Sequence, residues 1–295
     1  MRYLDPKNDL IFKRVFGEHP NITISFLNAL LPLEDGNEII SIEYMQTELV
    51  PEKPHLIKNS IVDVRCKDSF ERQFIVEMQM IWAETFKYRV LFNASKTFVR
   101  QLQKTEDYIK LKTVFALSLI DDIFEKESKE SYHHYKLTNQ NDLTKTIDGM
   151  ELIFVELPKY KLKNLNDKKL NILWLRYLTE MEKLMDMQKA NISLPEEILQ
   201  AMELTHESNY TPEQLAAYDK YIDAIRTEKT LIADAEARGE AKGEARGQAK
   251  GEAKGEAKGE ARLRQTAKNF KTLGLLTTQQ IADATGLTLA EVEAL

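Results

Sequence analysis

The first apolar residues of the chain have the spacing of a helix. They recur at Ile11, Phe12, Val15 and Phe16, three and four residues apart, which gathers them on one helical face. Asp5 followed by Pro6 is typical of a helix start, because Asp caps free backbone N–H groups and Pro fits the first turn. The pattern predicts a helix from Asp5 that ends in the break at 17–20, and a second short helix over about 21–31.

From Glu38 the hydrophobic period changes from helical spacing to two, which is typical of strands. Residues 38–50 predict one long strand, and 51–59 a loop. The stretches SIVDVRC (60–66) and QFIVEMQM (73–80) predict two further strands, separated by the polar turn KDSFER. Three strands in succession predict a meander of antiparallel hairpins.

The next part of the chain alternates between helix and strand patterns. Residues 82–102 predict a long helix, and 112–120 and 150–157 predict two nearly unbroken apolar strands. Continuous apolar strands indicate a sheet covered by helices on both faces. The order of elements therefore predicts a mixed α/β domain over 1–160. His133 and His134 fall in a polar stretch, which predicts a loop, and receive no role.

Beyond this domain the pattern predicts a helical extension over 161–235. Its apolar residues Trp174, Leu175, Tyr177 and Leu178 are expected to pack back onto the first domain. Residues 236–262 then repeat every four residues, with Gly at 239, 243, 247, 251, 255 and 259. Each Gly costs a helix about 1 kcal/mol relative to Ala, and the repeat has no apolar face. We expect a solvated spacer of marginal helicity.

The last segment, 263–295, predicts a small helical module. Thr277 with Gln280 and Thr288 with Glu291 have capping-box spacing, and Gly286 suits the turn between two helices. A helix-turn-helix invites a DNA-binding interpretation, yet no Lys or Arg occurs from Leu275 onward. Because phosphate contacts supply most of the affinity for DNA, an interaction or capping module is favoured and DNA binding by this tail is the alternative.

The composition of the chain limits the cellular compartment and the kinds of metal site that we expect. No apolar run is long enough to cross a membrane, no secretion signal is recognised at the start, and Cys66 is the only cysteine. These features predict a cytoplasmic protein without a membrane partner and without a Cys/His zinc site. The net charge of −6 means that any contact with nucleic acid would use a local basic stripe.

Two acidic residues, Asp63 and Glu77, interrupt the apolar strands 60–66 and 73–80. A tight hairpin with its tip near Phe70 sets Lys67 opposite Gln73 and Asp63 opposite Glu77. Opposed residues lie about 4.5–5.5 Å apart, so the two carboxylates would repel unless a cation lies between them. A divalent cation with oxygen ligands, such as Mg²⁺, suits this arrangement. The alternative is that both acids lie on a solvated face.

The acids and several longer stretches resemble the PD-(D/E)XK nuclease superfamily, in its recombination-promoting nuclease and putative transposase branch. The stretches are DPKNDLIFKRVFG (5–17), IVDVRCKDSFERQFIVEMQM (61–80), QLQKTEDYIKLKTVFALSLID (101–121) and FVELPKY (154–160). With the Gly/Glu/Lys repeat, the likeness covers nearly the whole chain. It implies a restriction-endonuclease-like mixed sheet flanked by helices, with a helical C-terminal extension.

The resemblance also implies a function and the residues that carry it. The protein would be a DNA endonuclease that needs Mg²⁺ or Mn²⁺, with Asp63 and Glu77 as metal ligands and Asp9 as a possible addition. Gln79 stands where the superfamily usually has lysine and Val62 where it has proline. Since an amide only hydrogen-bonds the attacking water, activation of that water would fall on the metal or on a lysine from elsewhere.

Basic residues on the predicted helix after the second acid are candidates for contacts with DNA phosphates. Arg89, Lys96 and Arg100 share one helical face with Asn93, although an ordinary exposed face explains them equally well. A two-fold dimer would let two sites act on both DNA strands, and the C-terminal module would contact a further copy or a protein partner. The alternatives are a catalytically lapsed nuclease fold that acts as a binding or assembly module, and a transposase that also joins strands.

Overall fold

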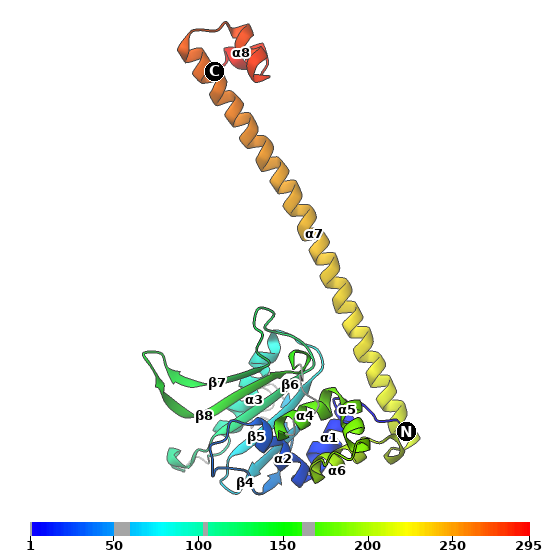
Figure 1. Cartoon of the computed structure of the whole chain (residues 1–295). Helices are drawn as coiled ribbons and strands as arrows, with labels where there is room; N and C mark the ends of the chain where they lie inside the picture. The colour runs from blue at the N-terminus through cyan, green and yellow to red at the C-terminus, as the bar shows by residue number, and fades with distance from the viewer. Residues whose placement is uncertain (1, 50–59, 103–105, 161–168) are drawn as a thin grey trace. The chain divides into compact units, whose positions relative to one another are not determined.

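Six strands form a mixed sheet, which confirms the α/β class expected from the sequence. The computed structural model describes residues 2–49, 60–102, 106–160 and 169–295. The strand order is β1 (Ile42–Tyr44), β4 (Val64–Asp68), β5 (Gln73–Gln79), β6 (Val114–Ile120), β8 (Asp142–Glu156) and β7 (Tyr132–Asn139). The central pairs β5–β6 and β6–β8 are parallel, and the pairs on either side of them are antiparallel. Figure 1 shows this sheet with its flanking helices.

Helices cover both faces of the sheet, as the apolar strands predict. One core joins Val64, Cys66 and Val76 to α1 (Asp9–Glu18), α2 (Pro20–Leu30), α4 (Leu170–Thr179), α5 (Met181–Lys189) and α6 (Glu196–Leu204). The other core joins Ile75 and Ala116 to α3 (Thr85–Val99). Short 3₁₀ turns cover Tyr108–Lys110, Leu157–Lys159 and Glu207–Asn209. Trp174, Leu175, Tyr177 and Leu178 of α4 are buried in the first core.

The first helix starts later than its sequence signals suggest. It begins at Asp9, and the side chain of Asn8 caps it by accepting a hydrogen bond from the backbone N–H of Leu10 at 3.0 Å. Asp5 instead accepts from the N–H of Lys7 at 3.0 Å in the preceding turn, so the expected start at Asp5 is wrong. The helix also continues through Gly17 to Glu18. As a result, Asp9 lies in the first turn of α1.

Two expected strands are broken into shorter pieces. Residues 38–49 hold only β1 and the two-residue β2 (Glu48–Leu49), which pairs with β3 (Ser60–Ile61) as a separate small sheet; residues 50–59 lie outside the described part. The expected strand 60–66 bends at Asp63, between β3 and β4. Val62 therefore packs in the α3 core whereas Val64 packs in the opposite core, although residues two apart on an unbroken strand would share one face.

A strand also occurs where the sequence predicts a loop. His133 and His134 lie in β7, at the edge of the sheet, opposite Phe154 and Ile153 of β8. Their partner strand begins at Asp142, eight residues before the expected start. The side chains of β7 are exposed or only half-buried along its whole length, so the strand lacks the apolar alternation that a packed face would give.

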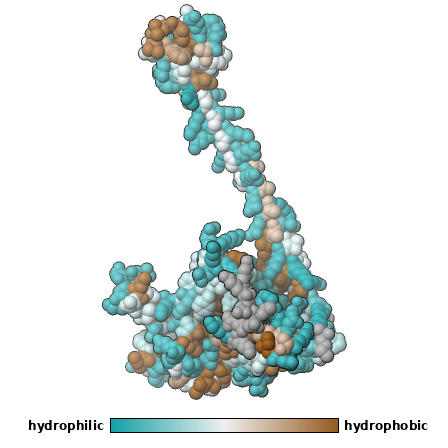
Figure 2. Space-filling view, viewed as in Figure 1, coloured by the Kyte–Doolittle hydropathy of each residue, from teal (hydrophilic) through white to brown (hydrophobic). Residues whose placement is uncertain are grey.

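The chain divides into two compact units, Met1–Arg226 and Thr227–Leu295. Helix α7 (Pro212–Leu273) runs through the whole glycine repeat, and its side chains there are exposed and hydrophilic (Figure 2). Within the second unit, α8 (Thr278–Thr285) and α9 (Leu289–Glu293) each begin with the capping box that the sequence predicts, and Gly286 has the left-handed φ of 73°. Ile281, Ala282 and Val292 form a small core with Ala267 of α7.

Candidate active site

The hairpin β4–β5 brings the two strand acids together. Its register pairs Lys67 with Gln73 and Val64 with Val76, as expected. Asp63 comes just before β4 and Glu77 just after Val76, so both acids lie at the same end of the hairpin, and Asp63 accepts a hydrogen bond from the backbone N–H of Met78. Glu77 lies near the carboxyl end of β5, beside the parallel strand β6. Asp63 lies at the bend that precedes β4. The register is decided locally, because a three-residue turn closes the hairpin and Asp68 accepts backbone N–H bonds within it, from Phe70 at 3.0 Å and Arg72 at 2.9 Å.

Glu77 is a buried carboxylate with incomplete pairing. Its residue is 5% exposed. Oε1 accepts a hydrogen bond from Asn93 Nδ2 at 2.9 Å, and Oε2 accepts a long one from Arg89 Nη2 at 3.4 Å. Burial raises the pKa of Glu77, and the charge of Asp63 adds to this, while Asn93 and Arg89 act in the other direction. Glu77 would therefore gain from a closer cation.

Asp63 is held by the backbone of the opposite strand. Its Oδ2 accepts from the N–H of Met78 at 2.7 Å, and its Oδ1 lies 3.8 Å from Lys13 Nζ, which comes from α1. Burial raises the pKa of Asp63 more than the Met78 N–H and the Lys13 charge lower it. Glu77 is thus a buried carboxylate and Asp63 a half-buried one, and the charge of each is only partly compensated.

Asp9, the third acid named by the resemblance, lies on α1 beside the same lysine. Its Oδ1 accepts from Lys13 Nζ at 2.6 Å, so Lys13 links Asp9 to Asp63. Within the described residues, no group of three or more Asp, Glu, His or Cys side chains is assembled closely enough to hold a metal ion. Any metal in this site would accordingly rely on the carboxylate pair, with water and substrate oxygens completing its shell.

Comparison with known proteins identifies the scaffold that carries these acids. A protein-family model described as "PD-(D/E)XK nuclease family transposase" matches residues 6–235. The chain belongs to this family. The matched range includes α1, the acid hairpin, α3 and the helical extension, and it supports a nuclease- or transposase-like function. No curated protein and no solved structure matches the chain.

Gln79 stands at the position where the resemblance places a lysine. Both the oxygen and the nitrogen of its side-chain amide form hydrogen bonds. Its Oε1 accepts from Arg89 Nη2 at 2.7 Å, and its Nε2 donates to the backbone O of Ile81 at 2.5 Å. The Arg89 guanidinium therefore bridges Gln79 and Glu77. In this family member a positive charge reaches the motif from α3 rather than from the motif strand.

The other two basic residues on α3 differ from Arg89. Lys96 is buried, with its Nζ 5.5 Å from the centre of the Phe92 ring, and burial together with the charge of Arg100 lowers its pKa. Arg100 is the C-cap of the helix. Of the three, Arg89 contacts the acid pair, through Glu77.

Two side chains that contact the acids received no role from the sequence. Asn93 is fully buried and donates to Glu77, and Lys13 contacts both Asp63 and Asp9. Asn93 lies one helical turn from Arg89, and its place on the same helical face as Arg89 was a signal for it. The spacing of four residues predicts the pair of Lys13 with Asp9, but the distance of Lys13 from Asp63 depends on how α1 packs on the sheet.

A second buried carboxylate, Glu156 at the end of β8, lies outside this site. It is fully buried, and its Oε2 accepts from Lys159 Nζ at 2.5 Å and contacts His133 Nε2 at 2.9 Å. Its Oε1 accepts from the N–H groups of Phe124 and Glu125 at 2.7 and 3.1 Å. These bonds outweigh burial and lower the pKa of Glu156.

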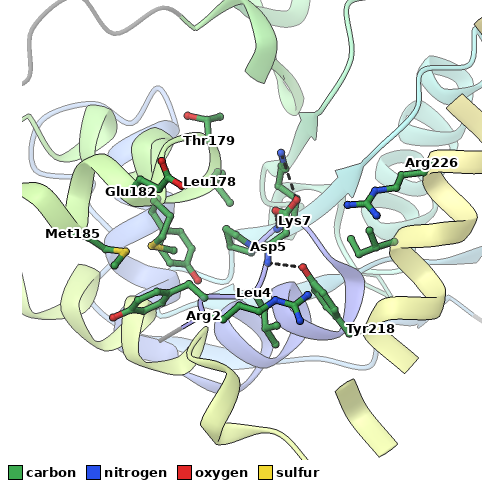
Figure 3. A pocket seen from close by; sticks show the side chains of 15 residues that line it. Arg2, Leu4, Asp5, Lys7, Leu178, Thr179, Glu182, Met185, Tyr218 and Arg226 are labelled. Atoms are coloured by element: carbon green, nitrogen blue, oxygen red, sulfur yellow. Dashed lines mark hydrogen bonds and ion pairs between the residues drawn. The ribbon is translucent and has the colours of Figure 1, made fainter. Parts of the chain in front are cut away.

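A pocket of about 690 Å³ opens elsewhere on the first unit, around the turn that precedes α1. Its lining includes Arg2, Lys7, Glu182 and Tyr218, and the backbone N–H of Asp5 donates to Tyr218 Oη at 2.9 Å (Figure 3). Neither Asp63 nor Glu77 lines it. Among the described residues, no helix has the length and hydropathy that spanning a membrane requires.

Proposed function

We propose that the chain is a metal-dependent DNA endonuclease that hydrolyses phosphodiester bonds with Mg²⁺ or Mn²⁺. The observation that carries the proposal is the pair Asp63 and Glu77, at the same end of one hairpin on a nuclease-family scaffold and short of positive charge. The membership of the family points to DNA as the substrate class.

The donor set fits a hard divalent cation. Both acids supply oxygen ligands, and their pKa values are raised by burial, so a cation between them would offset the cost of two neighbouring negative charges that are only partly solvated. Mg²⁺ takes one or two carboxylates and keeps several waters or phosphate oxygens. Asp9 would join only by releasing its 2.6 Å bond to Lys13. When bound, the cation would lower the pKa of a coordinated water and offset charge on the phosphate.

The surrounding side chains of this site would orient the two carboxylates, position the attacking water and hold the phosphate. Asn93 keeps the Glu77 carboxylate oriented through its buried amide, and the N–H of Met78 does the same for Asp63. Gln79 would orient the attacking water by exchanging one of its present partners for it. Arg89 would hold a phosphate oxygen near the acids, and Lys96 and Arg100 remain predicted phosphate contacts farther along α3.

A second candidate function is a catalytically lapsed nuclease fold that acts as a binding or assembly module. The observation that favours it is Gln79: it lacks the charge of the family lysine, and its amide is already bonded to Arg89 and Ile81. A strand-joining transposase is a third possibility within the family, and its products would distinguish it.

We also propose that the chain self-associates as a two-fold dimer and that the C-terminal module contacts a protein partner. Supporting the dimer, α3 exposes an apolar stripe of Tyr88, Leu91, Phe92 and Val99. Antiparallel packing of two such helices would set the acidic start of one, Glu84, beside the basic end of the other, Arg100. Light scattering should report a dimer that Phe92→Glu converts to monomer; a monomeric intact chain would contradict this.

The decisive experiment incubates the purified chain with supercoiled plasmid in Mg²⁺, in Mn²⁺ and in EDTA. We expect nicking that requires a divalent metal and is lost in Asp63→Ala and Glu77→Ala. The same variants should lose Mg²⁺ binding in calorimetry, because their effect acts through the metal.

Lys67→Met serves as a control, since Lys67 also bridges two acids, Glu43 and Glu71, but outside the site. Metal-independent nicking, or equal rates in the intact chain and both variants, would contradict the endonuclease. If the intact chain also binds no Mg²⁺, the binding-module alternative is favoured. Joined strands in the product gel would favour the transposase.

A further inference from the structure

The acid pair is flanked by two cations that come from two different helices. Arg89 reaches it from α3 and Lys13 from α1. The motif strand itself offers the neutral Gln79 at the position of the family lysine. The two cations differ in how they are held, and this difference indicates which one can serve the reaction.

Arg89 is committed to the architecture of the site. Its Nη2 donates to Gln79 Oε1 at 2.7 Å and to Glu77 Oε2 at 3.4 Å, and its guanidinium lies 4.7 Å from the centre of the Phe86 ring. Moving it toward a substrate would leave the carboxylate of Glu77 with less compensation for its burial. Arg89 is therefore placed best to hold Glu77 and Gln79 in position.

Lys13 has a backbone position fixed by packing and an exposed head group. Neighbouring residues of α1, Ile11, Phe12 and Val15, are fully buried in the core, so the Cα of residue 13 has a defined place. The side chain of Lys13 is 41% exposed and lies between Asp9 and Asp63. Arg89 is 49% exposed, so the two cations differ in their partners and not in their exposure. An ion pair between side chains this exposed is weak in water, so the Lys13 ammonium can exchange Asp9 for a phosphate oxygen without releasing Glu77 or Gln79.

We propose that Lys13 supplies, from α1, the positive charge that the motif lysine supplies from the strand in other family members. This inference rests on the proposed endonuclease function and names one further catalytic residue for it. In the reaction, the oxygen of a water bonds to phosphorus as the bond from phosphorus to the leaving sugar oxygen breaks. One proton of that water passes to solvent, and the leaving oxygen takes a proton from solvent. Lys13 stays protonated and stabilises negative charge on the phosphate oxygens.

The test compares four variants with the intact chain. Lys13→Met should slow plasmid nicking about 100-fold, the scale of losing one charged group that acts on the transition state, while its Mg²⁺ affinity in calorimetry stays unchanged. Lys13→Arg should keep much of the activity, because it keeps the charge. Adding Gln79→Lys to Lys13→Met should recover at least tenfold, because it returns the charge to the motif strand. Lys67→Met should nick at the rate of the intact chain.

The outcomes separate this inference from the function on which it rests. If the intact chain nicks and Lys13→Met nicks equally fast, the endonuclease stands and the role of Lys13 is overturned. If Lys13→Met loses Mg²⁺ binding, or if Gln79→Lys does not recover its activity, Lys13 only positions Asp63 and the inference fails as well. If the intact chain does not nick with any metal, the proposed function fails and the role of Lys13 is overturned with it.

Discussion

Glu77 and Glu156 are two buried glutamates on parallel strands of the same sheet. Their carboxylates differ in the number of hydrogen-bonding and charged partners, and their pKa values shift in opposite directions. Glu156 receives Lys159, His133 and two backbone N–H groups, and these lower its pKa in spite of its burial. Glu77 receives one amide and a long contact to Arg89, and burial raises its pKa.

The degree of charge compensation distinguishes a carboxylate that stabilises the fold from one that can bind a cation. Breaking a fully compensated buried charge cluster costs stability, because its partners are left unpaired. An undercompensated carboxylate costs the fold free energy in the absence of a ligand, and that cost is recovered when a cation binds. The comparison therefore supports a structural role for Glu156 and the proposed role of Glu77 in binding a cation.

The largest contrast is expected in activity. Glu77→Gln should reduce metal-dependent nicking about 1,000-fold or more, since it removes half of the carboxylate pair. Glu156→Gln, assayed at a temperature at which it is folded, should stay within a few-fold of the intact chain. Plasmid nicking with Mg²⁺ measures both. Equal losses in the two variants would remove the distinction between the two glutamates.

The next contrast is in stability. Glu156→Gln should lower the free energy of unfolding by about 3 kcal/mol, because Lys159 and His133 lose their charged partner. Fluorescence in a urea titration can follow the unit concerned, since both tryptophans of the chain, Trp82 and Trp174, lie in Met1–Arg226. A change below about 0.5 kcal/mol would mean that the cluster is not structural.

Glu77→Gln is expected to change the free energy of unfolding in the opposite direction when no metal is present. Replacing an undercompensated buried carboxylate by a neutral amide should raise the stability at pH 7 by about 1 kcal/mol, the usual size of a stabilising substitution at a functional site. Saturating Mg²⁺ should stabilise the intact chain but leave this variant unchanged. A destabilised variant, or one that Mg²⁺ stabilises as much as the intact chain, would argue against a cation site at Glu77.

The smallest effect is the pH dependence, and its sign differs between the two residues. The folded pKa of Glu77 is raised, so its contribution to stability is present below the unfolded pKa, about 4.3, and is lost as pH rises through the folded pKa. The folded pKa of Glu156 is lowered, so its contribution is present above the unfolded value and is lost as pH falls through the folded pKa. Unfolding titrations from pH 3 to 7 on both Gln variants should show difference curves of opposite slope. Parallel curves would contradict the comparison.

Much of the candidate site was predictable because its geometry is local. The tight turn near Phe70 and the period of two were enough to predict the register from Lys67 and Gln73 to Val64 and Val76. The capping boxes at Thr277 and Thr288 were equally local. The predictions that were wrong concern features that depend on residues distant in the chain. The strand expected over 60–66 bends at Asp63 because its first residues pair with β2 rather than with the main sheet, a choice that no local pattern reveals.

The sequence by itself determined the mixed sheet, the acid pair and the helix boundaries of the C-terminal module, because alternation, turn chemistry and caps act between residues a few positions apart. Only the tertiary structure decided which partners each acid receives. Asn93 and Arg89 reach Glu77, and Lys13 reaches Asp63, through the packing of α3 and α1 on the two faces of the sheet. Helix packing depends on the summed burial of many apolar side chains, so the identity of a polar partner cannot be read from its own neighbourhood in the chain.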